Sequence, residues 1–237
     1  MRTDAAGRRC EVTPRQLAAL YALRFLPAHL AQLAALGRQL GGALRRVVEK
    51  GDGRLRLVDV GCGPGTAGLA LADGLPDLAE RTLYVGVDRA AAMTGLAAEL
   101  LRDATDGRLA VRFAERLTLA EETAPDAPGT TLFVFMHSTV QLGAGRAARL
   151  ARAMKEAAGR TGRRRLLVLV VDTETDAALR AHAALAGEWR TGALLLLRRT
   201  GLSGGDGVLP PAVAELWWLA GGDGAGAPTD GPARYGP

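Results

Sequence analysis

Glycines spaced two residues apart stand near residue 60, at Gly61, Gly63 and Gly65, with an aspartate, Asp59, just ahead of them. Glycines in such a turn let the backbone approach a ligand closely. The N-terminus of a following helix favours negatively charged groups. The segment therefore predicts a ligand-binding turn that leads from a strand into a helix.

A second carboxylate ends the next apolar stretch. Asp88 directly follows residues 83–87 and lies 23 residues after Gly65. In a strand–helix–strand unit this position meets a bound ribose, and a carboxylate accepts hydrogen bonds from both ribose hydroxyls. We therefore predict that Asp88, with its neighbour Arg89, contacts a nucleoside.

The glycine spacing separates two classes of ligand. A dinucleotide site uses Gly-x-Gly-x-x-Gly/Ala to bind pyrophosphate through backbone N–H groups. Here Thr66 stands in place of the third glycine, and Pro64 lacks an N–H. Segment 57–67 instead resembles motif I of class I methyltransferases, which use S-adenosylmethionine and release S-adenosylhomocysteine. The resemblance covers residues 54–220 and implies no metal. It places the methionine end of the cofactor on Asp59, Gly61, Cys62, Gly63 and Gly65.

The same resemblance predicts an adenine contact after the third strand. The sequence there ends in Glu115 followed by Arg116. Members of this family often have aspartate in this place, so Glu115 is the candidate. The alternative is that Glu115 and Arg116 form a solvated charged pair.

A polar cluster follows the apolar stretch 131–136, where the family places the transferring methyl group. It consists of His137, Ser138, Thr139 and Gln141. Among these only histidine ordinarily titrates near neutral pH, so we predict His137 as a general base. Segment 137–154 also resembles small-molecule O-methyltransferases that use a histidine base, although Ser138-Thr139 replaces their usual Asp-Trp. Alternatively, His137 caps a helix or packs against the cofactor, and Ser138, Thr139 and Gln141 hold the acceptor.

The elements that must position these residues alternate between strand-like and helical patterns. Such alternation predicts a mostly parallel sheet with helices on both faces. The last two strands lack a long helix between them and read as an antiparallel hairpin. The expected fold is a Rossmann-like seven-stranded α/β sheet, with strands at 55–60, 83–87, 109–113, 131–136, 166–171, 193–199 and 214–219. Helices are expected at 67–75, 89–102, 144–157 and 175–187.

An N-terminal helical lid is expected over residues 13–50. Thr13-Pro14 is a favourable helix start, and Pro27 should kink or split the segment. Tyr21, Phe25 and His29, spaced by four, are candidates to face the substrate, and simple packing is the alternative. Around this lid we predict a flexible N-terminus over 1–12, a cofactor-binding domain over 51–220 and a Gly/Pro-rich tail over 221–237.

Composition limits the possible partners, cysteine chemistry and cellular location of the protein. The net charge is +5, carried mostly by arginine as in GC-rich bacterial genomes, and the aromatic share is 4%. A basic chain permits RNA binding, but few aromatics leave little surface for stacking single-stranded bases. Cys10 and Cys62 predict neither a disulfide nor a zinc site. The N-terminus does not read as a signal peptide, and we expect a cytoplasmic protein that does not enter a membrane.

These features predict a biosynthetic methyltransferase that acts on an oxygen or nitrogen of a small-molecule or peptide-like acceptor. One alternative is an rRNA methyltransferase, because segment 21–30 is similar to methyltransferase-like proteins associated with the small ribosomal subunit. Another is a methyltransferase fold kept as a non-catalytic binding subunit. The sequence leaves the oligomeric state open.

Overall fold

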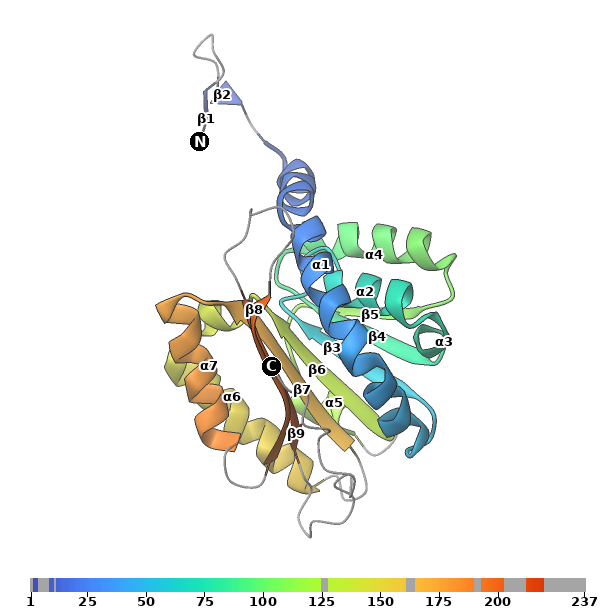
Figure 1. Ribbon diagram of the computed structural model, residues 1–237. Helices are drawn as coiled ribbons and strands as arrows, with labels where there is room; N and C mark the ends of the chain where they lie inside the picture. The colour runs from blue at the N-terminus through green and yellow to red at the C-terminus, as the bar shows by residue number, and fades with distance from the viewer. Residues whose placement is uncertain are drawn as a thin grey trace.

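The computed structural model describes residues 2–3, 9–10, 12–124, 128–160, 165–189, 193–202 and 212–219. Its centre is a seven-stranded sheet in the order β5-β4-β3-β6-β7-β9-β8 (Figure 1). The pairs of β9 with β7 and with β8 are antiparallel, and the other pairs are parallel. The strands are β3 (Leu55–Val60), β4 (Thr82–Val87), β5 (Ala110–Ala114), β6 (Thr130–Met136), β7 (Arg165–Thr173), β8 (Ala193–Leu202) and β9 (Ala212–Leu219). This topology confirms the predicted fold class.

Helices cover both faces of the sheet. Successive residues of a strand point to opposite faces, so each face carries apolar side chains that a helical layer buries. Leu57 packs in the core beneath one helical layer, and Val58 packs beneath the other. The first layer contains α1 (Pro14–Glu49), α2 (Thr66–Gly74), α3 (Pro76–Ala79) and α4 (Ala91–Thr105). The second contains α5 (Leu119–Glu122), α6 (Thr139–Arg160) and α7 (Asp176–Trp189). Gly143 interrupts α6, with φ 66° and ψ 157°, so the regular helix follows it, as the predicted start at 144 requires.

Strand β3 lies between β4 and β6. The chain continues from β3 to β4 and β5 on one side, and then crosses to β6 on the other side. In an open parallel sheet such a switch point opens a crevice at the carboxyl ends of the strands. The ends of β3, β4 and β6 carry the glycine turn, Asp88 and His137 respectively. The topology therefore brings the three predicted site segments to one edge of the sheet.

Helix α1 runs as one element of 36 residues, so of the two predicted effects of Pro27, a kink or a split, the split is wrong. Thr13 begins it with a capping box: its hydroxyl accepts from the Gln16 N–H, and the Gln16 side chain accepts from the Thr13 N–H. Pro27 is exposed, and so is Leu23, which is 77% exposed one turn earlier. The carbonyl that Pro27 cannot bond therefore lies on a solvent-facing turn, where water can bind it.

By length and composition alone, α1 also qualifies as a candidate membrane-spanning helix. Its residues Leu33, Leu36 and Val48 pack in the core against the sheet. Packing thus accounts for part of the apolar character of α1, and its composition does not establish a membrane location.

The N-terminal segment contains a short antiparallel pair, β1 (Arg2–Thr3) and β2 (Arg9–Cys10), which the sequence did not predict. The rest of the predicted flexible segment 1–12, apart from Val12, lies outside the described residues. The predicted tail over 221–237 also lies outside them.

Candidate functional site

The glycine turn uses left-handed backbone conformations at all three spaced glycines. Gly61, Gly63 and Gly65 have φ values of 75°, 50° and 83°. Residues with a Cβ rarely adopt this region, so the spacing of the glycines is a backbone requirement. The N–H groups of Gly61 and Cys62 donate to the carbonyl of Val87, at 2.8 and 3.1 Å. These bonds fix the turn to the end of β4.

The turn is also closely packed. A Cβ at Gly61 would lie 2.8 Å from the Cβ of Ser138, and a Cβ at Gly65 would lie 3.2 Å from that of Ala97. The turn therefore fits between the end of β6 and helix α4 with no space for side chains at these two positions.

Asp88 bridges the turn and the start of α4. One carboxylate oxygen accepts from the Gly63 N–H at 3.0 Å, and the other accepts from the Ala90 N–H at 2.9 Å. The side chain is half-buried, and each oxygen keeps a further lone pair. Arg89 and Glu115 are exposed. The backbone N–H of Asp88 donates to the Ala114 carbonyl at 3.1 Å, which places Glu115 just beyond this edge of the sheet.

Asp59 and the Cys62 thiol lie beneath the turn. Asp59 is 2% exposed and accepts from the Tyr84 hydroxyl at 2.8 Å. Burial raises the pKa of Asp59 to about 7 against the lowering effects of the Tyr84 and Ala67 hydrogen bonds. Burial, with the nearby charges of Asp59 and Asp88, raises the pKa of the Cys62 thiol. These buried side chains support the turn from the protein interior.

His137 follows β6 with φ 52°, an uncommon conformation for a residue with a Cβ. Its N–H donates to the Val171 carbonyl at 2.8 Å. Its ring Nε2 lies 2.8 Å from Oε1 of Gln32 on α1, and Nε2 of Gln32 donates to the Leu202 carbonyl at 3.2 Å. That bond directs the amide oxygen of Gln32 toward the ring, which favours the tautomer of His137 with the hydrogen on Nε2 and the lone pair on Nδ1.

Two buried polar atoms beside the turn lack hydrogen-bond partners within the described part of the chain: Nδ1 of His137 and Oγ of Ser138. Nδ1 lies 3.8 Å from Oδ1 of Asp172; that oxygen accepts from the Thr173 N–H, and Oδ2 of Asp172 accepts from the Thr139 hydroxyl. Buried polar atoms are nearly always paired, so these two atoms have capacity left to pair with water or with a polar group bound beside the turn.

A row of rings crosses this edge of the sheet. Ring centroids lie 4.8 Å apart for Tyr21 and Phe25, 6.1 Å for Phe25 and His29, and 4.4 Å for His29 and His137. The Tyr21 ring lies over the turn, 3.8 Å from where a Cβ of Gly63 would be. Tyr21, Phe25 and His29, spaced by four on α1, therefore connect the glycine turn to His137.

The row is uncharged at neutral pH. Burial lowers the pKa of His137 to about 4, and burial with the nearby His137 lowers that of His29 to about 4. Burial and the charge of Asp88 raise the pKa of Tyr21. Because its ring is shielded from water, we expect His137 to titrate below the neutral pH that its residue type alone suggests.

The structure brings most of the predicted residues together and leaves Arg89, Glu115 and Gln141 exposed at the periphery. Sequence reasoning missed Gln32 and Tyr84. Gln32 is fully buried on α1, and a glutamine one turn after the predicted His29 was the available signal. Within the described ranges, no three His, Cys, Asp or Glu side chains gather in a group able to hold a metal.

No protein-family model matches the sequence, and no curated protein matches it. Solved structures match in fold. Magnesium protoporphyrin IX methyltransferase from Synechocystis PCC 6803, with bound S-adenosylmethionine, has a TM-score of 0.51 and 16% identity over 90% of this chain and 86% of its own. A candidate O-methyltransferase from Nostoc punctiforme PCC 73102 has a TM-score of 0.51 and 15% identity over 86% of this chain and 59% of its own. The chain therefore has the fold of class I methyltransferases.

Proposed function

We propose that this protein is a methyltransferase that uses S-adenosylmethionine and methylates an oxygen or nitrogen of a small-molecule or peptide-like acceptor. One observation carries the proposal: the left-handed glycine turn after β3 is joined through the Gly63 N–H to Asp88 at the end of β4. This arrangement offers a close backbone surface beside a carboxylate, at the switch point of a methyltransferase fold.

The residues present fit such a cofactor. Asp88 has lone pairs left for ribose hydroxyls, and the glycines leave the ligand side of the turn without side chains. The unpartnered atoms on His137 and Ser138 offer polar contacts close by. Glu115 and Arg89, near the end of β5 and beyond Asp88, are the candidates for the adenosine edge.

When bound, the cofactor supplies a methyl group on a sulfonium, which is already a strong leaving group. The chain must therefore align the acceptor atom and exclude water. Nδ1 of His137 carries the lone pair and is the candidate to take a proton from an acceptor hydroxyl or amine. The carboxylate of Asp172, 3.8 Å away, would then face the protonated ring.

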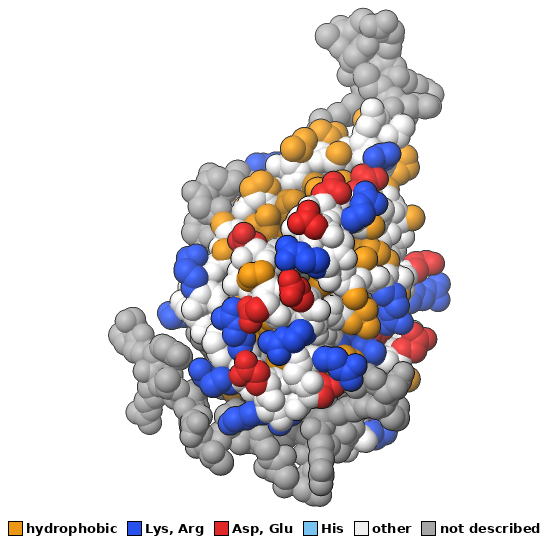
Figure 2. Space-filling model, turned by 90° about the vertical axis from the view of Figure 1, so that its right-hand side faces the viewer, with side chains coloured by type: hydrophobic (Ala, Val, Ile, Leu, Met, Phe, Trp, Pro, Cys, Tyr) orange, Lys and Arg blue, Asp and Glu red, His pale blue; other side chains and the backbone are white. Residues whose placement is uncertain are grey.

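The ring row supports a small acceptor. Tyr21, Phe25, His29 and His137 form an uncharged wall of flat surfaces above the turn, which suits an apolar or aromatic acceptor better than a phosphate backbone. Figure 2 shows basic and acidic side chains interspersed over the face on the α4 side, without the single-sign basic surface that favours RNA.

A cytoplasmic location stays a prediction.

The substitution Asp88→Ala tests the cofactor site. It should weaken S-adenosylmethionine binding by about 2–3 kcal/mol, because charge-assisted hydrogen bonds to the ribose are lost. Calorimetry measures the change, and Asp103→Ala, which removes a carboxylate that is 74% exposed on α4, is the matched control. Asp88→Asn retains an acceptor for the Gly63 N–H and separates loss of charge from loss of the turn. Normal cofactor binding by Asp88→Ala would refute the assignment.

A further inference from the structure

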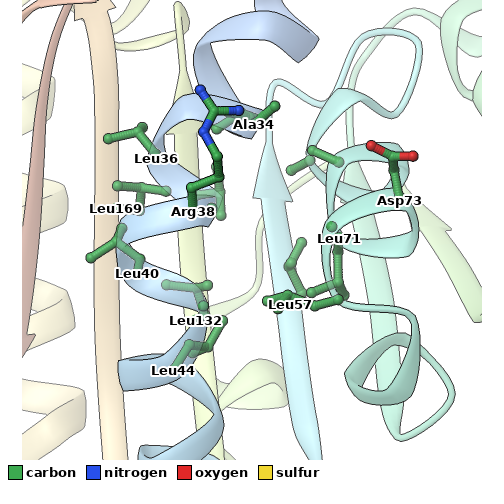
Figure 3. Close-up of a pocket in the computed structure, with 18 of the residues that line it drawn as sticks. Ala34, Leu36, Arg38, Leu40, Leu44, Leu57, Leu71, Asp73, Leu132 and Leu169 are labelled. Atoms are coloured by element: carbon green, nitrogen blue, oxygen red, sulfur yellow. The ribbon is translucent and has the colours of Figure 1, made fainter.

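A second site lies away from the glycine turn, between helices α1 and α2. It is a cavity of about 260 Å³ that is open to solvent on one side and floored by the sheet (Figure 3). Its walls are mostly apolar side chains, about half of the lining residues being leucines, among them Leu36, Leu40, Leu57, Leu71, Leu132 and Leu169.

The helices meet at one end of this cavity and separate beyond it. At Gly41 of α1 a Cβ would lie only 2.9 Å from a methyl group of Leu75, so the helices are in close contact there. One helical turn earlier, a Cβ at Gly37 would meet no atom within 4 Å. Gly37 lines the cavity, so the space beside it is open to a bound molecule or a larger side chain.

The chemistry of the walls defines what can fill the gap. An apolar lining offers water no hydrogen bonds, so apolar molecules can displace water from this open cavity. A methylene group occupies about the volume of a water molecule, about 30 Å³, so the cavity accommodates about eight to ten carbons of a flexible chain.

Polar groups stand only at the rim among the lining residues. Arg38 on α1 and Asp73 on α2 flank the opening and are both exposed (Figure 3). Neither makes an ion pair with another described residue. A guanidinium binds a carboxylate through two parallel hydrogen bonds, so Arg38 is suited to the polar end of an acidic amphiphile.

We propose that this cavity binds a medium-chain aliphatic carboxylate, with its alkyl chain among the leucines and its carboxylate at Arg38. The site is separate from the proposed methyl-transfer site and does not depend on that activity. The negative charge of Asp73 on the opposite helix confines the carboxylate to the Arg38 side.

Gly37→Leu tests the site by filling it. The new side chain enters open space and replaces glycine by a better helix former, so the variant should fold. Gly187→Leu is the matched control, because Gly187 is an exposed glycine of α7 with nothing within 4 Å of its Cβ position, outside the cavity. If Gly37→Leu fails to fold, Ala70→Leu fills the cavity from the α2 wall.

Calorimetry with decanoate and decanol gives the result. Wild type and Gly187→Leu should bind decanoate equally, and Gly37→Leu should bind it at least about tenfold more weakly. Arg38→Gln should weaken decanoate about three- to tenfold and leave decanol unchanged. The proposal is overturned if wild type binds no decanoate or if Gly37→Leu binds it normally. It is also overturned if Arg38→Gln weakens both ligands equally. None of these titrations contains S-adenosylmethionine, so their failure leaves the proposed function untouched.

Discussion

His137 combines a left-handed backbone, a buried ring and a hydrogen bond to a helix that lies more than a hundred residues earlier in the chain. Strained backbone persists where the surroundings hold it, and here the Val171 carbonyl and Gln32 do so. Burial keeps the ring neutral at pH 7, with a pKa of about 4. A neutral ring with its lone pair on Nδ1 is the form that a general base requires.

Substituting His137 tests that role. His137→Gln should lower methyl transfer about 10²- to 10⁴-fold while cofactor affinity changes little. Because burial lowers the pKa of His137 to about 4, the wild-type rate should rise with pH through that region and be flat near neutral pH. The measurement is a pH–rate profile of both proteins. Activity of His137→Gln within a few-fold of wild type would mean that the residue only aligns the acceptor.

His29 gives a test through stability. Its pKa is lowered from 6.5 to about 4, so the unfolded chain binds the proton more readily than the folded protein. The neutral form of His29 therefore favours the folded protein. This contribution to the unfolding free energy is fully present above pH 6.5 and is lost as the pH falls toward 4. The variant His29→Phe keeps a ring between Phe25 and His137 but cannot titrate.

Urea unfolding at pH 7 and pH 5 measures this effect. Wild type should lose about 2 kcal/mol more of its unfolding free energy than His29→Phe does over this interval. The pKa of Asp59 is raised to about 7, so its contribution to the unfolding free energy increases as the pH falls from 7 to 5. This contribution is the same in both proteins. Equal losses in the two proteins would show that His29 titrates normally.

At the scale of elements, α2 is held by contacts that a glycine makes possible. A Cβ at Gly68 would lie 2.8 Å from a Leu101 methyl group and 2.9 Å from the ring of Tyr84. Tyr84 is fully buried and donates to Asp59 beneath the turn. Displacing it therefore disturbs both the packing of α2 and the glycine turn.

Gly68→Ala should destabilise the protein by about 1–3 kcal/mol, although alanine is the better helix former. Gly95→Ala is the matched control, because Gly95 lies within α4 and has nothing within 4 Å of its Cβ position. The control should gain up to about 1 kcal/mol. Denaturant unfolding measures both variants, and a stabilised Gly68→Ala would contradict the packing described here.

The strands were predictable because their apolar runs are short and are separated by helical patterns. The predicted strand 83–87 differs from β4 by one residue, and the reversed β9 follows from the absence of a long helix after β8. Pro27 shows what local sequence rules do not predict. Whether a proline breaks a helix depends on whether its face meets solvent or the core, and only the tertiary structure decides that.

At the scale of the molecule, the candidate site was predictable where it follows from topology. Gly61, Asp88 and His137 end neighbouring parallel strands, so one edge of the sheet gathers them. Gln32 was not predictable, because its contact depends on the orientation of α1 across the sheet and on the Leu202 carbonyl of β8. Whether the buried atoms of His137 and Ser138 find partners likewise depends on tertiary packing that the sequence pattern does not specify.

The central claim is that the glycine turn and Asp88 hold S-adenosylmethionine. The most direct measurement is calorimetry of the wild-type protein with S-adenosylmethionine, S-adenosylhomocysteine and NAD, each titrated alone. We predict that the first two bind at about micromolar affinity, near −8 kcal/mol, and that NAD does not bind, because Pro64 and Thr66 leave the turn without the pyrophosphate pattern. Binding of NAD, with no heat from either sulfur compound, would contradict it.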